Sequence, residues 1–408
     1  MKTSRFFALG CAFALLCTAF SSCKDDKLII NGNLTVSEPQ TAEGASVNGT
    51  EVTFEYSGGE IALPLTMVTN APEADVVYTY SVKSNADWCV ASVNDNVLTL
   101  SVEPTAEKTA KTGTVDLAVV CSDETAELTP LTLTVSQNAF SSVFDMVIVQ
   151  PGTFKFGEGK GYSQDYAHDV TISKPYYIAT TVVTQKVYEE VMGKNPSNTK
   201  FIGDNYPVNK MTWSDACEFC NKLSEKEGLT PVYTPGEILK VSDGWSYMNM
   251  QDYLYDHATV GNGYRLPTEA EWEFAQKGGE EGCKNLTMFA GSDIFDEVGW
   301  YDANSKKGSE YILHEVGLKM PNQLGLYDMS GNVSEWCFDW AYKYHDPLQT
   351  TDPETDPVGP GENRNDGKVI KGGYYSGPEY KGKVYDSNYQ TGAETRVTTG
   401  FRVVRSIK

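Results

Sequence analysis

The stretch that decides the fold is Gly263–Glu273, which reads GYRLPTEAEWE. Thr268 and Glu271 stand three residues apart and form a capping box, in which each side chain binds the backbone N–H group of the other residue. We therefore expect a helix to begin after Thr268 and to end near Gly278. The three glutamates of this stretch occupy every second position. We expect them to spread round the helix and not to form one acid–base pair.

Two more helices are indicated on the N-terminal side of this stretch. Thr212 is a suitable N-cap, and an apolar stripe follows it until Gly228, where the helix should end. Thr184 to Met192 predicts a shorter helix with one apolar face. Cys217 and Cys220 lie on the first of these helices without a second cysteine pair, so buried or disulfide-bonded cysteines are a simpler interpretation than a metal site.

A second diagnostic stretch, Gly325–Trp336, reads GLYDMSGNVSEW, and the motifs Lys371–Gly373 and Gly400–Arg402 follow it. In this order, and together with Gly263–Glu273, these segments resemble the formylglycine-generating enzyme (sulfatase-modifying factor) family. The resemblance covers roughly residues 145 to 408. It implies an irregular α+β domain of the C-type-lectin-like type.

Catalysis in this family requires two cysteines between the Gly-Gly and Gly-Phe-Arg motifs, where their thiolates bind copper and activate oxygen. Soft thiolate ligands are those that Cu(I) selects. The resemblance places these positions at about Gly377 and Gly382, and the whole segment 374–399 contains no cysteine. Copper is therefore not expected, and we expect the oxidase activity to be lost.

Calcium is a second cofactor that the resemblance implies. Its ligands would be the carbonyl groups of Ser330, Gly331 and Val333 and the carboxylate of Glu335. A set of oxygen ligands in a loop suits calcium. Ser334 stands where the family usually has tryptophan, which changes the packing and not the ligands. A purely structural Glu335 is the alternative.

The segment 374–389 is dense in Tyr, Ser, Gly and Asn. These residue types dominate antibody binding surfaces, because tyrosine gives a large rigid contact area while small polar residues adapt. In the family fold this segment lines the substrate groove, and it also resembles the variable regions of retroelement-diversified C-type-lectin-like proteins. The alternative is that some of its tyrosines pack in the core. The predicted ligand-binding residues are Tyr375, Ser376, Glu379, Tyr380, Tyr385 and Asn388.

Residues 33–140 have a different pattern. Short alternating runs, such as Val52–Tyr56 and Leu98–Val102, are separated by turn residues, which predicts an all-β immunoglobulin-like sandwich. Ser84–Trp88 and the closing Leu131–Ala139 resemble the BACON domain of exported bacterial proteins. Family members have been suggested to bind carbohydrate, but a lone Trp88 on a strand more often packs inward, so we interpret this domain as a spacer.

The first 22 residues are typical of a secretory signal, with a basic start at Lys2 and Arg5 and an apolar run over Ala8–Phe20. That run is too short to span a bilayer as a helix, which takes about 20 residues. The small residues before Cys23 resemble the lipobox of bacterial lipoproteins, so we expect Cys23 to be acylated, with residues 23–32 as a tether. Lys24–Asp26 resembles the signal for the outer face of the outer membrane.

The chain is strongly acidic, with a formal net charge of −22. Loss of residues 1–22 removes two basic groups and no acid, which moves the charge to −24. Such a protein repels phosphate backbones, so we expect no nucleic-acid partner. Six cysteines remain besides Cys23; in an oxidising compartment they can pair, but the spacing leaves their connectivity open.

These observations favour a surface-exposed lipoprotein, held to the membrane only by its lipid, whose C-terminal domain binds a glycan or a protein. The alternative is an oxidoreductase of the formylglycine-generating type, or a related enzyme, acting on exported proteins. A structural part of a surface assembly is a third and weaker reading.

Overall fold

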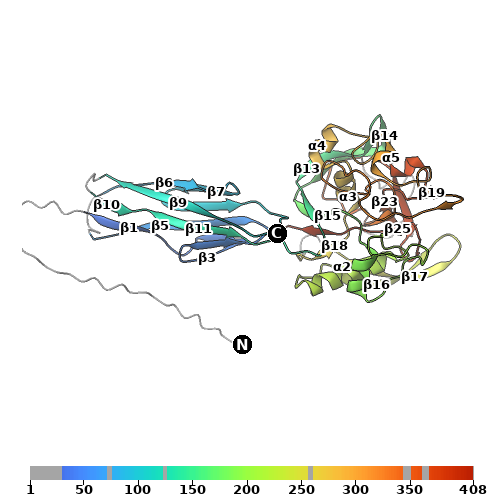
Figure 1. Ribbon diagram of the computed structural model, residues 1–408, viewed down its shortest axis with the longest axis horizontal. Helices are drawn as coiled ribbons and strands as arrows, with labels where there is room; N and C mark the ends of the chain where they lie inside the picture. The colour runs from blue at the N-terminus through green and yellow to red at the C-terminus, as the bar shows by residue number, and fades with distance from the viewer. Residues whose placement is uncertain are drawn as a thin grey trace, which may run out of the picture.

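The computed structural model describes residues 30–70, 76–122, 126–255, 261–342, 351–360 and 367–407. Figure 1 shows an elongated all-β region and a rounded mixed region. We call residues 30–138 the N-terminal region and residues 145–407 the C-terminal domain. The expected signal peptide and Cys23 lie outside the described residues. Within these ranges, no helix is long and apolar enough to cross a membrane.

The N-terminal region consists of two β-sheets. The first has the strand order β10-β1-β5-β8-β7, with β2 paired to β5, and the second has the order β3-β4-β11-β9-β6. The strands are β1 (Asn31–Val36), β2 (Thr41–Glu43), β3 (Ala45–Asn48), β4 (Glu51–Phe54), β5 (Gly59–Thr69), β6 (Tyr78–Ser84), β7 (Cys89–Asn94), β8 (Val97–Val102), β9 (Lys111–Cys121), β10 (Glu127–Thr129) and β11 (Leu131–Gln137).

Both sheets contribute alternate side chains to one apolar cluster. Leu98 and Leu100 of the first sheet and Val115 and Leu117 of the second are fully buried in it. This is the arrangement expected when side chains on alternate positions of a strand face the same side. Trp88 is half-buried and packs against this cluster, as expected of a packing residue.

The C-terminal domain has short strands and few helices. Its strands are β12 (Met146–Val149), β13 (Gly152–Gly159), β14 (Tyr162–Ile172), β15 (Tyr176–Ala179), β16 (Thr234–Ser242), β17 (Tyr247–Leu254), β18 (Tyr264–Arg265), β19 (Lys306–Lys307), β20 (Glu310–Tyr311), β21 (Ser334–Trp340), β22 (Glu354–Thr355), β23 (Gly367–Lys371), β24 (Ser387–Thr391), β25 (Thr399–Gly400) and β26 (Val404–Ser406). Its helices are α1 (Gln185–Met192), α2 (Trp213–Lys226), α3 (Glu269–Gln276), α4 (Gly279–Lys284), α5 (Phe295–Val298) and the 3₁₀ helix η1 (Glu379–Gly382). The larger sheets run β12-β15-β26-β18 and β24-β23-β21-β25.

The three helices predicted from the sequence are confirmed as α1, α2 and α3. Thr212 and Thr268 each cap their helix through a capping box, the first with Asp215 and the second with Glu271. The mostly β architecture with few helices is also confirmed.

The glutamates of α3 connect it to its neighbours in the sequence motifs. Glu271 binds both terminal nitrogens of Arg265, with Nη2 at 2.6 Å. Glu273 is fully buried and pairs with Lys371 of the Lys-Gly-Gly motif at 2.8 Å. Glu269 approaches the same Lys371 nitrogen at 3.6 Å. The prediction that the three glutamates spread round the helix is therefore wrong for Glu269 and Glu273. Both side chains reach Lys371, because residues four apart share one helix face.

An ordered joint connects the two regions. Phe140 stacks on Tyr177 with ring centroids 4.4 Å apart. The Tyr177 hydroxyl donates to the carbonyl of Thr105 at 2.9 Å and lies 3.3 Å from that of Tyr56. The guanidinium of Arg405 lies over the rings of Tyr56 and Phe140 and donates to the Tyr56 hydroxyl. Residues from both regions thus share one aromatic cluster where they meet in Figure 1.

Six cysteines of the described part of the chain are free thiols. Cys217 and Cys220 lie on the buried face of α2, and burial raises the pKa of both thiols. No group of three or more His, Cys, Asp or Glu residues able to hold a metal ion occurs within the described ranges. The interpretation of this pair as buried cysteines agrees with the structure.

Candidate functional site

The segment predicted to bind ligand is divided between core and surface. Tyr375 is 5% exposed and meets the ring of Phe201 edge-on at 6.0 Å. It belongs to an apolar cluster with Val182 and Leu313. Because its ring is covered by the protein itself, Tyr375 is a packing residue and offers no surface to a ligand.

The exposed part of the segment begins at η1. Glu379 and Tyr380 are exposed, the latter by 55%, while Ser376 is half-buried. Lys381 lies 5.3 Å from the centre of the Tyr380 ring and 3.7 Å from a carboxylate oxygen of Asp386. Burial raises the pKa of Asp386 to about 6, and the nearby lysine opposes this shift.

Tyr385 and Asn388 are both half-buried. The Tyr385 ring lies against Gly159 at the end of β13, where a Cβ atom would stand 2.2 Å from it. Asn388 lies on β24 opposite Ile370 of β23. Of the six predicted residues, Glu379 and Tyr380 are therefore the ones that the structure presents most openly.

The predicted calcium ligand Glu335 is engaged by protein groups. Its two carboxylate oxygens accept hydrogen bonds from Arg402, at 2.6 Å from Nε and 2.7 Å from Nη2. The indole N–H of Trp272 donates to the same carboxylate at 2.7 Å. All three side chains are fully buried. A calcium ion would have to displace Arg402, so this arrangement does not fit the calcium prediction.

The other three residues of the calcium prediction are held by the backbone around them. Ser330 is buried, and its hydroxyl donates to the carbonyl of Gly382 at 2.7 Å. Gly331 has a φ of 91°, which favours glycine, and its N–H donates to the carbonyl of Gly372. Val333 packs in the same cluster as Tyr375. These residues build a turn against the Lys-Gly-Gly motif.

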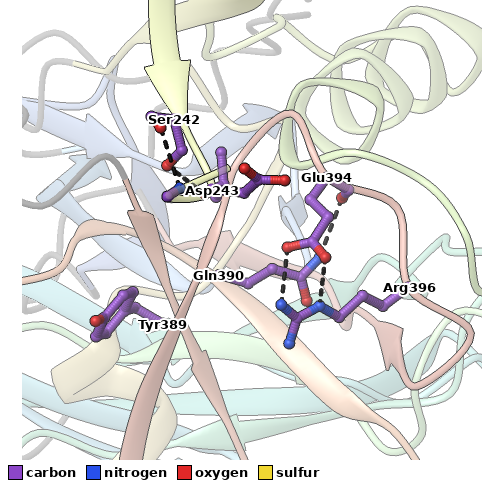
Figure 2. A pocket seen from close by; sticks show the side chains of 8 residues that line it. Ser242, Asp243, Tyr389, Gln390, Glu394 and Arg396 are labelled. Atoms are coloured by element: carbon purple, nitrogen blue, oxygen red, sulfur yellow. Dashed lines mark hydrogen bonds and ion pairs between the residues drawn. The ribbon is translucent and has the colours of Figure 1, made fainter. Parts of the chain in front are cut away.

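A pocket of about 340 Å³ lies at the other end of β24, between that strand and the tip of the β16–β17 hairpin. It is lined by Ser242, Asp243, Gly244, Tyr389, Gln390, Thr391, Glu394 and Arg396. Figure 2 shows the Glu394 and Arg396 side chains together, with Asp243 and Tyr389 around the same opening. None of the residues predicted to bind ligand lines this pocket. The Asp243-Gly244 dipeptide between two alternating runs was the available hairpin signal.

The polar groups of this pocket are held in place. Glu394 and Arg396 form a two-bond pair, with Nε–Oε1 and Nη2–Oε2 distances of 2.8 and 2.9 Å. The Gln390 side chain donates to the backbone carbonyl of Glu394 at 3.0 Å. Across the opening, Asp243 accepts from the N–H groups of Trp245 and Ser246, and these bonds lower the pKa of Asp243.

A comparison with known protein families shows which family this chain belongs to. The model for the sulfatase-modifying factor enzyme 1-like domain matches residues 132–407. The chain belongs to the sulfatase-modifying factor enzyme 1-like family. The match begins within β11, about one strand before the boundary of 145 expected from the motifs.

Several relatives of this family are similar to the chain. Chaperone protein LppX of Paenibacillus barcinonensis is 40% identical over 222 residues, which are 50% of this chain and 75% of that protein. The formylglycine-generating enzyme of Streptomyces coelicolor is 35% identical over 123 residues, 28% of this chain and 36% of the enzyme. The solved structure of Treponema denticola variable protein 1 is similar to the chain with a TM-score of 0.53 and 31% identity. The alignment covers 66% of this chain and 98% of the variable protein. The chain thus spans about a third of the length of the Streptomyces coelicolor enzyme.

The positions that the family resemblance assigns to cysteines are surrounded by aromatic rings in this sulfatase-modifying factor enzyme 1-like domain. A Cβ atom at Gly382 would stand 2.3 Å from the ring of Phe295. That ring stacks between Phe289 and Tyr301, with centroids 4.5 and 4.3 Å away. At Gly377 a Cβ atom would meet the ring of Tyr374 at 3.1 Å. A side chain at position 382 would therefore require Phe295 to move.

Proposed function

We propose that the C-terminal domain is a ligand-binding domain and not an oxidase of the formylglycine-generating type. The observation that carries this proposal is the environment of Gly382, where stacked aromatic rings occupy the space next to the position expected for a catalytic cysteine. The similarity to a chaperone and to a variable protein supports a role in binding other molecules.

The binding surface that we propose lies over η1 and β24 and includes Glu379, Tyr380, Tyr385 and Asn388. Tyr380, which is exposed, and Tyr385, which is half-buried, lie beside small polar residues and provide rigid contact area with little loss of side-chain entropy on binding. Ser376 borders this surface. Its ligand is an extracellular glycan or protein.

We further propose that acylation of Cys23 holds the protein at the outer membrane, facing outward. The N-terminal region would then act as a BACON-like immunoglobulin-like spacer. The joint between Tyr177, Phe140 and Arg405 supports this arrangement, because buried and stacked contacts hold the C-terminal domain on the end of the β region.

The test exposes the purified protein to arrays of glycans and of surface proteins. A parallel assay follows oxidation of a cysteine-containing sulfatase peptide with added copper. We expect saturable array binding that Tyr380→Ala weakens without a change in melting temperature. Tyr375→Ala is the contrasting variant and should lower the melting temperature. Oxidation of the peptide would establish the alternative, a formylglycine-generating oxidoreductase.

A further inference from the structure

We propose that the pocket between the β16–β17 hairpin and residues 389–396 binds a neutral saccharide. This inference rests on the proposed function, since it gives a ligand class to a domain that we propose to bind ligands. It adds a site at the C-terminal end of β24, which the tyrosine-rich segment 374–389 reaches only at Tyr389. Three features of the pocket carry it: its lining, its paired charges and the exposed tryptophan beside it.

The lining matches a saccharide better than a peptide side chain. Seven of the eight lining residues are polar or glycine, and the ring of Tyr389 is the one large apolar surface among them. Peptide recognition depends on apolar anchors that fill apolar pockets. A sugar ring instead needs a flat apolar surface for its C–H face and polar groups for its hydroxyls. A pocket of about 340 Å³ also lies at the lower end of the range for small ligands, about 300–1,000 Å³.

The Glu394–Arg396 pair supplies the polar groups. A hydroxyl both donates and accepts, whereas a carboxylate only accepts and a guanidinium only donates. Adjacent hydroxyls of a sugar can therefore donate to Glu394 and accept from Arg396. The two bonds to Glu394 use Nε and Nη2 of Arg396, and among the described residues its Nη1 has no partner. Since Gln390 fixes the backbone of this loop, the pair is preorganised and loses little entropy on binding.

Trp245 is the apolar element beside the pocket. Its side chain is 96% exposed at the tip of the hairpin, directly after Gly244, which lines the opening. Bonds from the backbone N–H groups of Trp245 and Ser246 to Asp243 hold this turn. Burial of a large apolar side chain contributes about 1.5–3 kcal/mol or more to stability. An indole that stays in solvent does not contribute this free energy to folding. Trp245 does not itself line the pocket, so a saccharide would cover its ring only by extending out of the pocket past Gly244.

The charges favour a neutral sugar over an acidic one. Glu394 and Arg396 cancel, so Asp243 leaves the pocket with one net negative charge, and the whole chain carries −22. Acidic saccharides and phosphates are repelled by such a surface. A neutral saccharide is not repelled by this negative charge.

The experiment measures binding of the purified protein to an array that carries neutral oligosaccharides of glucose, mannose, galactose and xylose together with galacturonate oligomers, and to a surface-protein array. The oligosaccharides that bind on the array are then titrated into the protein by calorimetry. We expect neutral oligosaccharides to bind and galacturonate oligomers not to bind. Trp245→Ala and Glu394→Gln should each weaken affinity about tenfold, the equivalent of one strong contact. Ile238→Ala is the matched control, because Ile238 is 69% exposed on β16 of the same hairpin and does not line the pocket; it should leave saccharide affinity unchanged.

The outcomes separate this inference from the proposed function. Absence of neutral-sugar binding, or equal affinity of Trp245→Ala, Glu394→Gln and the parent protein, overturns the saccharide site. Binding to immobilised proteins alone overturns it as well, but leaves the proposed function standing. Absence of binding on both arrays overturns both. Unchanged melting temperatures of the variants would show that lost affinity does not come from unfolding.

Discussion

Replacement of Arg402 by methionine tests whether the two family motifs Gly400–Arg402 and Gly325–Trp336 are joined by a buried ion pair. Arg402 is fully buried and donates to both oxygens of Glu335 and to the carbonyls of Ala179 and Tyr327. Methionine fills a similar space without donors, so Arg402→Met leaves Glu335 with a buried charge that lacks its cationic partner.

The magnitude follows from these contacts. Removal of one partner of a buried ion pair costs about 3–5 kcal/mol. Each carbonyl left without its donor adds up to about 1–3 kcal/mol, although such losses are not fully additive. We therefore expect Arg402→Met to reduce the free energy of unfolding of the C-terminal domain by at least about 4 kcal/mol. That is a large fraction of the 5–15 kcal/mol typical of a domain.

The assay is urea unfolding followed by tryptophan fluorescence, which reports mainly on the C-terminal domain because six of the seven tryptophans lie there: Trp213, Trp245, Trp272, Trp300, Trp336 and Trp340. Arg396→Met is the matched control. It breaks an Arg–Glu pair of the same two-bond geometry whose arginine side chain is 50% exposed, and exposed pairs contribute at most about 1 kcal/mol.

A double variant, Arg402→Met with Glu335→Leu, should recover part of the stability that the single variant loses, because it removes the unpaired charge. The reasoning is refuted if Arg402→Met loses no more stability than Arg396→Met. It is also refuted if the double variant shows no coupling between the two positions.

Three further predictions concern pH, calcium and the joint between the regions. Burial raises the pKa of Asp328 from 3.8 to about 6, so its contribution to stability is present below about pH 4 and lost as the pH rises through about 6. Asp328→Asn should thus gain about 2–3 kcal/mol relative to the parent protein between pH 4 and pH 7 in urea unfolding, and a constant difference across this range would contradict the assignment. Because Arg402 occupies the carboxylate of Glu335, we expect EDTA to leave the melting temperature unchanged; a fall that calcium reverses would show that a calcium site exists. Tyr177→Phe should separate the calorimetric transitions of the two regions by removing the bond to Thr105, whereas Tyr176→Phe, whose hydroxyl bonds the carbonyl of Glu271 within the C-terminal domain, should leave them coupled.

The sequence by itself determined the local structure and the family. Thr212 and Thr268 cap their helices through residues three positions away, and such contacts can be read from spacing alone. Alternation in Leu98–Val102 likewise marks a strand with one buried face. The motifs identified the family because their order along the chain is specific, and the match over residues 132–407 confirmed it.

Only the tertiary structure decided which of the expected site residues face a ligand. Tyr375 and Tyr380 are five positions apart in a segment of one composition, yet the first is covered by Phe201 and the second is exposed. The sequence favoured Glu335 as a calcium ligand, with a structural role as the alternative, and could not show that Arg402, 67 residues away, binds this carboxylate. The pocket joins Ser242 to Thr391 across 149 residues. Such neighbours are chosen by packing of the whole domain, because burial depends on what lies beside a residue in space and not on its position along the chain.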